Sequence, residues 1–181
     1  MIQMLRKRLD RKDEGFTLIE LMVVVLIIAI LLAIAIPTFL GARSRAQNRA
    51  AESNLRNALT AEKTAYTDNS SYVANTAVQS VEPSLSFLAS GVAPTGGNTV
   101  EVTTVDNANA VCLLGKSASG TYYGIFDVAS PDASTGSFLG SGTFYGSGTS
   151  TLACPTATTA AGAATSASGS TWGNATSLGG W

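Results

Sequence analysis

The sequence contains no histidine and only two cysteines, Cys112 and Cys154. Histidine-containing metal sites, Ser-His-Asp triads and Cys-His nucleophile pairs are therefore excluded. Charge is also scarce, because Asp, Glu, Lys and Arg make up 13 % of the 181 residues, against roughly 25 % in ordinary soluble domains. These absences argue against an enzyme and predict a protein without catalytic residues, metal or cofactor.

The few charges are unevenly placed along the chain. Five of the eleven bases lie before Gly15, five lie between Arg43 and Lys63, and only Lys116 follows. No charged residue follows Asp132. Because the net charge is -1 and the bases are confined to one part of the chain, there is no large basic surface for phosphates. We expect no direct nucleic-acid site.

A charged leader precedes a long apolar run. Residues 21–36 are all apolar, and only four residues interrupt apolar character between Phe16 and Leu40. As a helix this stretch would be about 37 Å long, enough to cross a hydrocarbon layer of about 30 Å. In a cleaved secretory signal a small-residue site closes the apolar run, and none closes this one cleanly. We therefore expect a membrane-spanning helix with residues 1–15 in the cytoplasm, although the bases after the run compete with those of the leader for that side.

Glu20 is the one ionisable residue inside this apolar helix. A carboxylate in a membrane-spanning segment is unfavourable and usually has a partner. No base of the same helix is placed to supply one, so we expect a partner from another chain. The alternative is that Glu20 lies at the level of the lipid headgroups.

The residues GFTLIE at 15–20, preceded by bases and followed by the unbroken apolar run, closely resemble the processing site and helix of type IV prepilins. The resemblance continues less specifically to about Tyr72 and is only architectural beyond it. It implies cleavage by a prepilin peptidase between Gly15 and Phe16 and N-methylation of Phe16. It also implies that Glu20 faces the Phe16 ammonium of a neighbouring subunit and fixes the axial register of assembly.

Pro37 and Gly41 mark the weakest part of the helix, since proline removes a backbone hydrogen bond. In the pilin family the matching region is commonly unwound in the filament, whereas a static kink is the alternative reading. After Ala42 the helix becomes amphipathic to about Tyr66, and its bases leave this half at a net +3. From Asp68 onward the net charge is -5, so contacts between subunits could have an electrostatic component, with simple solvation as the alternative.

The rest of the chain predicts an α+β fold, in which the long helix packs on a small antiparallel sheet. Strand patterns occupy residues 100–105, 111–114 and 121–128, with a further edge strand at 144–145 and a helical turn after Pro83. The expected divisions are a leader (1–15), a hydrophobic helix (16–40), its amphipathic half (41–66), a loop (67–98), the sheet (99–132) and a C-terminal region (133–181).

A further prediction concerns the two cysteines and the C-terminal region. An even count in an exported domain predicts a Cys112–Cys154 disulfide, which in pilins fastens a C-terminal loop to the sheet; two free buried thiols are the alternative. Of the 49 residues from 133 on, 38 are Ala, Ser, Thr or Gly, so we expect much loop there. Five aromatic residues are candidate packing anchors for it: Phe138, Phe144, Tyr145, Trp172 and Trp181.

The resemblance thus implies a structural subunit that moves from the inner membrane into a filament on the bacterial surface, serving adhesion, motility or DNA uptake. Its partners would be copies of itself, the inner membrane, the prepilin peptidase, an assembly platform and ATPase motors. The chain has no G-x-x-x-x-G-K-[ST] phosphate loop of its own. The alternatives are a major pseudopilin of a type II secretion system and a membrane-tethered hydrolase or sugar-binding module.

Overall fold

A computed structural model describes residues 15–130, 140–155, 157–158, 164–165 and 171–174. The chain divides into two compact units, Met1–Ala42 and Arg43–Trp181. Apart from Gly15, the expected leader lies outside the described residues, as do the candidate anchors Phe138 and Trp181.

Helix α2 (Leu18–Asn69) supplies the described part of the first unit and continues into the second. Its most apolar 18-residue window has a mean hydropathy of 3.3, and none of that window is buried. By length and composition, α2 is the one helix of the described residues that is able to cross a membrane. The long apolar helix expected from the sequence is confirmed. No other described part of the chain buries its most apolar window.

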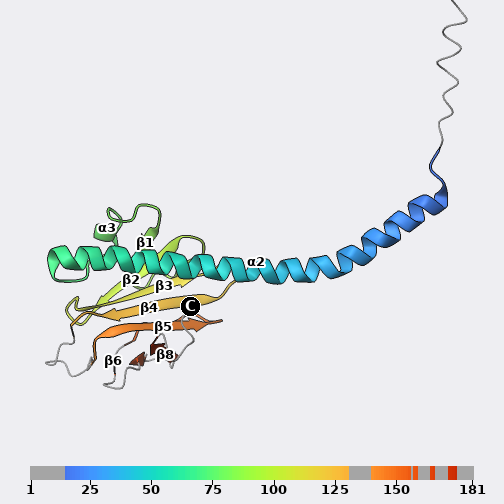
Figure 1. Cartoon of the computed structure of the whole chain (residues 1–181). Coiled ribbons are helices and arrows are strands. Elements are labelled where there is room, and N and C mark those ends of the chain that lie inside the picture. Colours follow the sequence, from blue (N-terminus) through green and yellow to red (C-terminus); the bar gives the residue numbers. More distant parts are fainter. Residues whose placement is uncertain (1–14, 131–139, 156, 159–163, 166–170, 175–181) are drawn as a thin grey trace, which may run out of the picture. The chain divides into compact units, whose positions relative to one another are not determined.

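The second unit is an eight-stranded sheet against which the C-terminal half of α2 packs (Figure 1). The strand order is β1-β2-β3-β4-β5-β8-β7-β6, and all neighbours are antiparallel except β1 and β2. The strands are β1 (Ser86–Leu88), β2 (Thr99–Val105), β3 (Ala110–Lys116), β4 (Tyr122–Val128), β5 (Gly142–Gly148), β6 (Ala157–Thr158), β7 (Ala164–Thr165) and β8 (Thr171–Asn174). The α+β class predicted from the sequence is confirmed.

The helical turn expected after Pro83 is wrong. Residues 86–88 form β1, which pairs in parallel with β2 and places Phe87 opposite Val100 in the core. A short helix, α3 (Asn75–Val78), lies instead in the stretch read as loop. The spacing of apolar residues in 84–88 is compatible with a helical turn or with a strand. Backbone pairing with β2 favours the strand.

The C-terminal region contributes more strand than its composition predicts. Strand β5 is not an edge, because it pairs with β4 over seven residues and with β8 on its other side. Backbone hydrogen bonds hold such a ladder whatever the side chains are, so residues rich in Gly, Ser and Thr can extend an existing sheet.

Two hydrophobic clusters cover the two faces of the sheet. The alternation along β3 shows this directly, since Val111 and Leu113 belong to the cluster beneath α2, whereas Cys112 and Leu114 belong to the other. Leu55 of α2 packs on the first face, close to Gly115. The second cluster is completed by residues from the C-terminal region, which explains why β3 is buried on both sides.

Candidate assembly site

Helix α2 begins with a reciprocal cap formed by Thr17 and Glu20. The Thr17 N–H donates to Glu20 Oε2 at 2.9 Å, the Thr17 hydroxyl donates to the same oxygen at 2.6 Å, and the Glu20 N–H donates to Thr17 Oγ1 at 3.3 Å. This is the capping box of a T-x-x-E sequence, which satisfies N–H groups that the first helical turn leaves without partners. Glu20 therefore has partners within its own chain.

The capping box is a feature that our reading of the sequence missed. The spacing of Thr17 and Glu20 directly before an apolar run is a recognised signature of a helix start. It gives Glu20 a role before any second subunit is present. An intermolecular contact of Glu20 must therefore share or replace the bonds to Thr17.

The apolar side chains of the first unit are largely exposed in the single chain. Phe16 is 84 % exposed and Leu18 76 %, and the large apolar residues from there to Leu40 remain exposed. A contiguous apolar surface of this extent marks a contact with lipid or protein. Glu20, near the start of α2, is the one acidic residue between Gly15 and Leu40.

Helix α2 continues without a break through Pro37 and Gly41. Proline has no N–H for the carbonyl one turn earlier. The hydroxyl of the next residue, Thr38, donates to the Ile34 carbonyl at 2.9 Å and adds a local bond in the weakened turn. The single chain thus keeps helical geometry where the sequence predicts the weakest segment.

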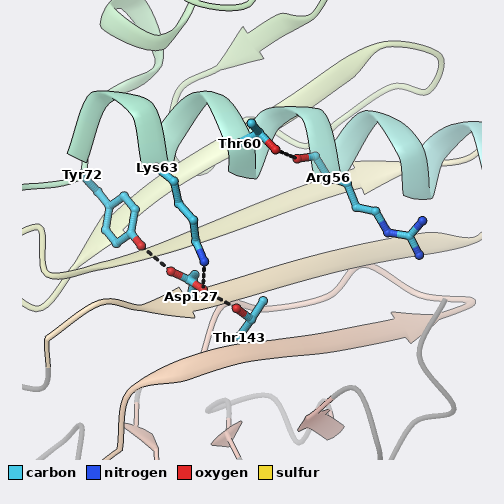
Figure 2. A network of polar contacts seen from close by, with 6 residues as sticks. All are labelled: Arg56, Thr60, Lys63, Tyr72, Asp127 and Thr143. Atoms are coloured by element: carbon cyan, nitrogen blue, oxygen red, sulfur yellow. Dashed lines mark hydrogen bonds and ion pairs between the residues drawn. The ribbon is translucent and has the colours of Figure 1, made fainter. Parts of the chain in front are cut away.

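Asp127 on β4 is the centre of a buried polar network in the second unit. Its carboxylate accepts hydrogen bonds from the Tyr72 and Thr143 hydroxyls, and Lys63 Nζ lies 3.1 Å from its Oδ1. Figure 2 shows the three side chains converging on Asp127 from α2, from the segment after it and from β5. Only 3 % of Asp127 is exposed, so these donors replace water and fasten the helix to the sheet.

This network has one consequence for Tyr72. Burial, followed by the hydrogen bond and the charge of Asp127, raises the pKa of Tyr72 above its ordinary value. The hydroxyl therefore keeps its proton as a donor. Sequence reasoning missed Asp127, although an acid within the apolar strand YYGIFDV is an available signal of a buried polar contact.

A disulfide and a tryptophan attach the C-terminal region to the sheet. Cys112 and Cys154 are bonded, with their Cα atoms 5.8 Å apart. Trp172 is 1 % exposed, and its Nε1–H donates to the carbonyl of Ala153, next to Cys154. The expectation that aromatic residues anchor this region is confirmed for Phe144 and Trp172, which are both buried in the second cluster.

The indole of Trp172 lies against two glycines that face each other across β4 and β5. Gly124 pairs with Gly146 in the ladder. A Cβ at Gly124 would lie 2.4 Å from Trp172 Cη2, and one at Gly146 would lie 3.1 Å from Cδ2. The absence of side chains at these two positions therefore creates the space that the indole fills.

The described residues present extended contact surfaces. Among the described residues, no group of three or more His, Cys, Asp or Glu side chains is placed to hold a metal ion. What the described chain presents is a capped apolar helix followed by a head with its own core. This combination defines a class of helix-anchored structural subunits.

Comparison with known proteins makes the class specific. The profile of the prokaryotic N-terminal methylation motif matches residues 10–36. A relative from Thermus thermophilus, the type IV wide pilus major component PilA4, is 34 % identical over 67 % of this chain and 85 % of its own length. The chain belongs to the type IV pilin family.

Two further relatives share this character. The type IV major pilin protein PilA of Myxococcus xanthus is 45 % identical over 36 % of this chain and 30 % of its own length. A fimbrial protein of Pseudomonas aeruginosa is 32 % identical over 63 % of this chain and 76 % of its own length.

Proposed function

We propose that this chain is the structural subunit of a type IV pilus on the bacterial surface, without catalytic activity of its own. The observation that carries the proposal is the exposed apolar first half of α2, joined to a head that has its own core. Lipid covers such a helix before assembly, and copies of the same helix cover it afterwards. The pilin relatives support this reading.

Maturation follows from the methylation motif at residues 10–36. We assign cleavage to the bond between Gly15 and Phe16 and N-methylation to the new terminus at Phe16. Gly15 and Phe16 are both exposed, and both precede the first residue of α2. A peptide bond outside regular structure is accessible to a prepilin peptidase at the membrane surface.

Glu20 fixes the register of assembly in this proposal. When the leader is removed, Phe16 acquires an ammonium group, and the Glu20 carboxylate of a neighbouring subunit is its counter-ion in apolar surroundings. The bonds to Thr17 hold the carboxylate near the helix start before that contact forms. Buried ion pairs are better devices for specificity than for stability.

Pro37 and Gly41 permit the helix to loosen when subunits pack. Pro37 has no N–H, so one helical hydrogen bond is missing. Glycine at position 41 destabilises a helix by about 1 kcal/mol relative to alanine. The segment that is helical in the single chain is therefore the first to unwind under packing forces. An assembly platform and ATPase motors of the inner membrane drive extraction and extension in this scheme.

The proposal is tested with Glu20→Gln and its matched control Glu52→Gln, the same change on the same helix outside the apolar stretch. We expect Glu20→Gln to insert into the membrane normally but to form few surface filaments, because the counter-ion of Phe16 is lost. Filaments are counted by electron microscopy, and insertion is measured by membrane fractionation. Normal filament numbers with Glu20→Gln, or equal losses with both variants, would contradict the role of Glu20.

No observation favours the type II secretion pseudopilin that the sequence left open. The filament proposal itself is tested by deleting the gene. Long surface filaments that disappear on deletion and return on complementation support it. Unchanged filaments with a loss of exoenzyme secretion would overturn it.

A further inference from the structure

Glu62 is a buried carboxyl group that the assembly site does not use. It lies on the face of α2 that packs in the head, and none of its surface is exposed. Its Oε2 accepts one hydrogen bond, from the Val73 N–H at 3.3 Å. Its Oε1 has no hydrogen-bond partner among the described residues.

Among the described residues, no positive charge is paired with this carboxyl. The adjacent Lys63 is ion-paired with Asp127. The other titratable groups near this site are Tyr66 on the same helix and Tyr72 directly after it, whose rings are in contact, and Asp127 on β4, which accepts from the Tyr72 hydroxyl. The Tyr72 hydroxyl already donates to Asp127, and the surrounding cluster is otherwise apolar except for Tyr123 of β4 and the partly buried Tyr145 of β5.

These surroundings favour the neutral form of the carboxyl. Burial raises the pKa of Glu62 to about 7, against which the Val73 hydrogen bond acts only partly. An ionised carboxylate with a buried, unpartnered oxygen must either take a proton or reach water. In the unfolded or open chain the group ionises near its ordinary value of 4.5.

The chain that follows the helix is the route by which Glu62 can reach water. Three hydrogen bonds hold the start of this chain: the Val73 N–H to Glu62, the Tyr72 N–H to the Ala108 carbonyl at 2.8 Å, and the Tyr72 hydroxyl to Asp127. The side chains of Tyr72 and Val78 are also buried in the cluster beneath α2. This chain leads only into the four-residue helix α3. Local opening of this segment would bring water to Glu62 without separating α2 from the sheet.

We propose that Glu62 is a proton-operated latch for residues 70–78. As a neutral carboxyl it holds this segment on the head, and when it loses its proton the segment can open. The proton leaves to solvent, and no bond other than O–H is broken. The device makes the attachment of the segment after α2 sensitive to pH near neutrality. It is independent of the assembly contact at Glu20, which lies in the other unit.

The direction of the effect follows from proton linkage. Because the pKa of Glu62 is higher in the closed state than in the open state, the closed state binds more protons between about pH 4.5 and pH 7. The closed state is therefore favoured most at acid pH and loses this advantage as pH rises through that window. Between about pH 5.5 and pH 8.5 the opening equilibrium should increase on the order of 30-fold.

Hydrogen–deuterium exchange of the full mature chain in detergent measures this opening. The measured rates are first corrected for the intrinsic pH dependence of exchange. Peptides covering residues 70–78 should then lose protection on the order of 30-fold between about pH 5.5 and about pH 8.5. Glu62→Gln, which keeps a carbonyl oxygen for the Val73 N–H, should abolish the change. The control Asp68→Asn removes an exposed carboxylate of the same helix and should leave it intact.

Constant protection in the wild-type chain, or the same pH dependence in Glu62→Gln, would overturn the latch. A measurement on the wild-type chain serves if Glu62→Gln does not fold. In a carbon-13 NMR titration of the chain labelled at glutamate carboxyls, the Glu62 signal should titrate near pH 7. A midpoint near the ordinary value of 4.5 would equally overturn the proposal.

Discussion

Three acidic side chains show how the number of local donors sets the role of a carboxylate in this chain. Glu20 receives two hydrogen bonds from Thr17 at an exposed helix start. Asp127 is buried but receives two hydroxyl donors and a lysine. Glu62 is buried with a single backbone donor. The first caps a helix, the second joins elements, and the third is left responsive to pH.

Removing the Asp127 carboxylate should destabilise the head. Asp127→Ala leaves the Tyr72 and Thr143 hydroxyls and Lys63 without their shared acceptor, so we expect a loss of about 2–4 kcal/mol in the free energy of unfolding. Asp127→Asn keeps one acceptor oxygen and should lose less. Denaturant titration of the mature chain in detergent, followed by tryptophan fluorescence, provides the measurement.

The control for this prediction is Asp68→Ala. Asp68 is exposed on the last turns of α2, and its removal should change the unfolding free energy by no more than about 0.5 kcal/mol. Equal stability of Asp127→Ala and Asp68→Ala would show that the network contributes nothing.

The glycines beneath Trp172 give a graded prediction. A methyl group at Gly124 would lie 2.4 Å from the indole and 2.9 Å from Leu114, and one at Gly146 would lie 3.1 Å from the indole. At Gly148, the control position, the nearest atom belongs to Leu152 at 3.5 Å. We therefore expect destabilisation in the order Gly124→Ala, Gly146→Ala, Gly148→Ala, with about 1–3 kcal/mol for the first and little change for the last.

This series is best made in a Trp181→Phe background, where Trp172 is the one remaining tryptophan. A red-shifted emission of Trp172 in Gly124→Ala would report its displacement into water. If Gly124→Ala and Gly148→Ala unfold at the same denaturant concentration with the same emission, the close packing of the indole is refuted.

At the scale of elements, the sequence predicts α2 well and the C-terminal strands poorly. An apolar run followed by an amphipathic pattern persists over the whole helix, so local periodicity and packing agree. Strands β6 and β7 have only two residues each and come from a region dominated by Ala, Ser, Thr and Gly. Their pairing depends on partners that are distant in sequence, which local composition does not encode.

The disulfide is the element-scale contact that is simplest to test. It joins β3 to the segment before β6 across a sequence separation of 42. On the chain-entropy model, closing such a loop stabilises the fold by about 3–4 kcal/mol. We expect Cys112→Ser/Cys154→Ser to unfold at a clearly lower denaturant concentration than the wild-type chain.

The same bond predicts the chemistry of the two thiols. Both cysteines of the mature chain, unfolded without reductant, should resist alkylation, and both should become labelled after reduction. Mass spectrometry of the alkylated chain gives the count directly. Labelling of both thiols in the unreduced sample would rule out the bond.

At the scale of the whole molecule, the chain combines two units that require different surroundings. The first exposes an apolar helix with no cover of its own, and the second buries two clusters on the faces of one sheet. The sequence predicts this division because the apolar run and the GFTLIE motif are local patterns. It predicts Trp172 as a packing anchor but not the residues that Trp172, Asp127 and Glu62 contact, because these are brought together by the fold.

The most direct test of the account is the intact mass of the subunit sheared from the cell surface. The account predicts a chain that begins at Phe16, carries one added methyl group, and retains the apolar half of α2. A surface form that keeps residues 1–15, or one that begins downstream of Ile36, would contradict it, since the helix would then be either unprocessed or absent from the filament.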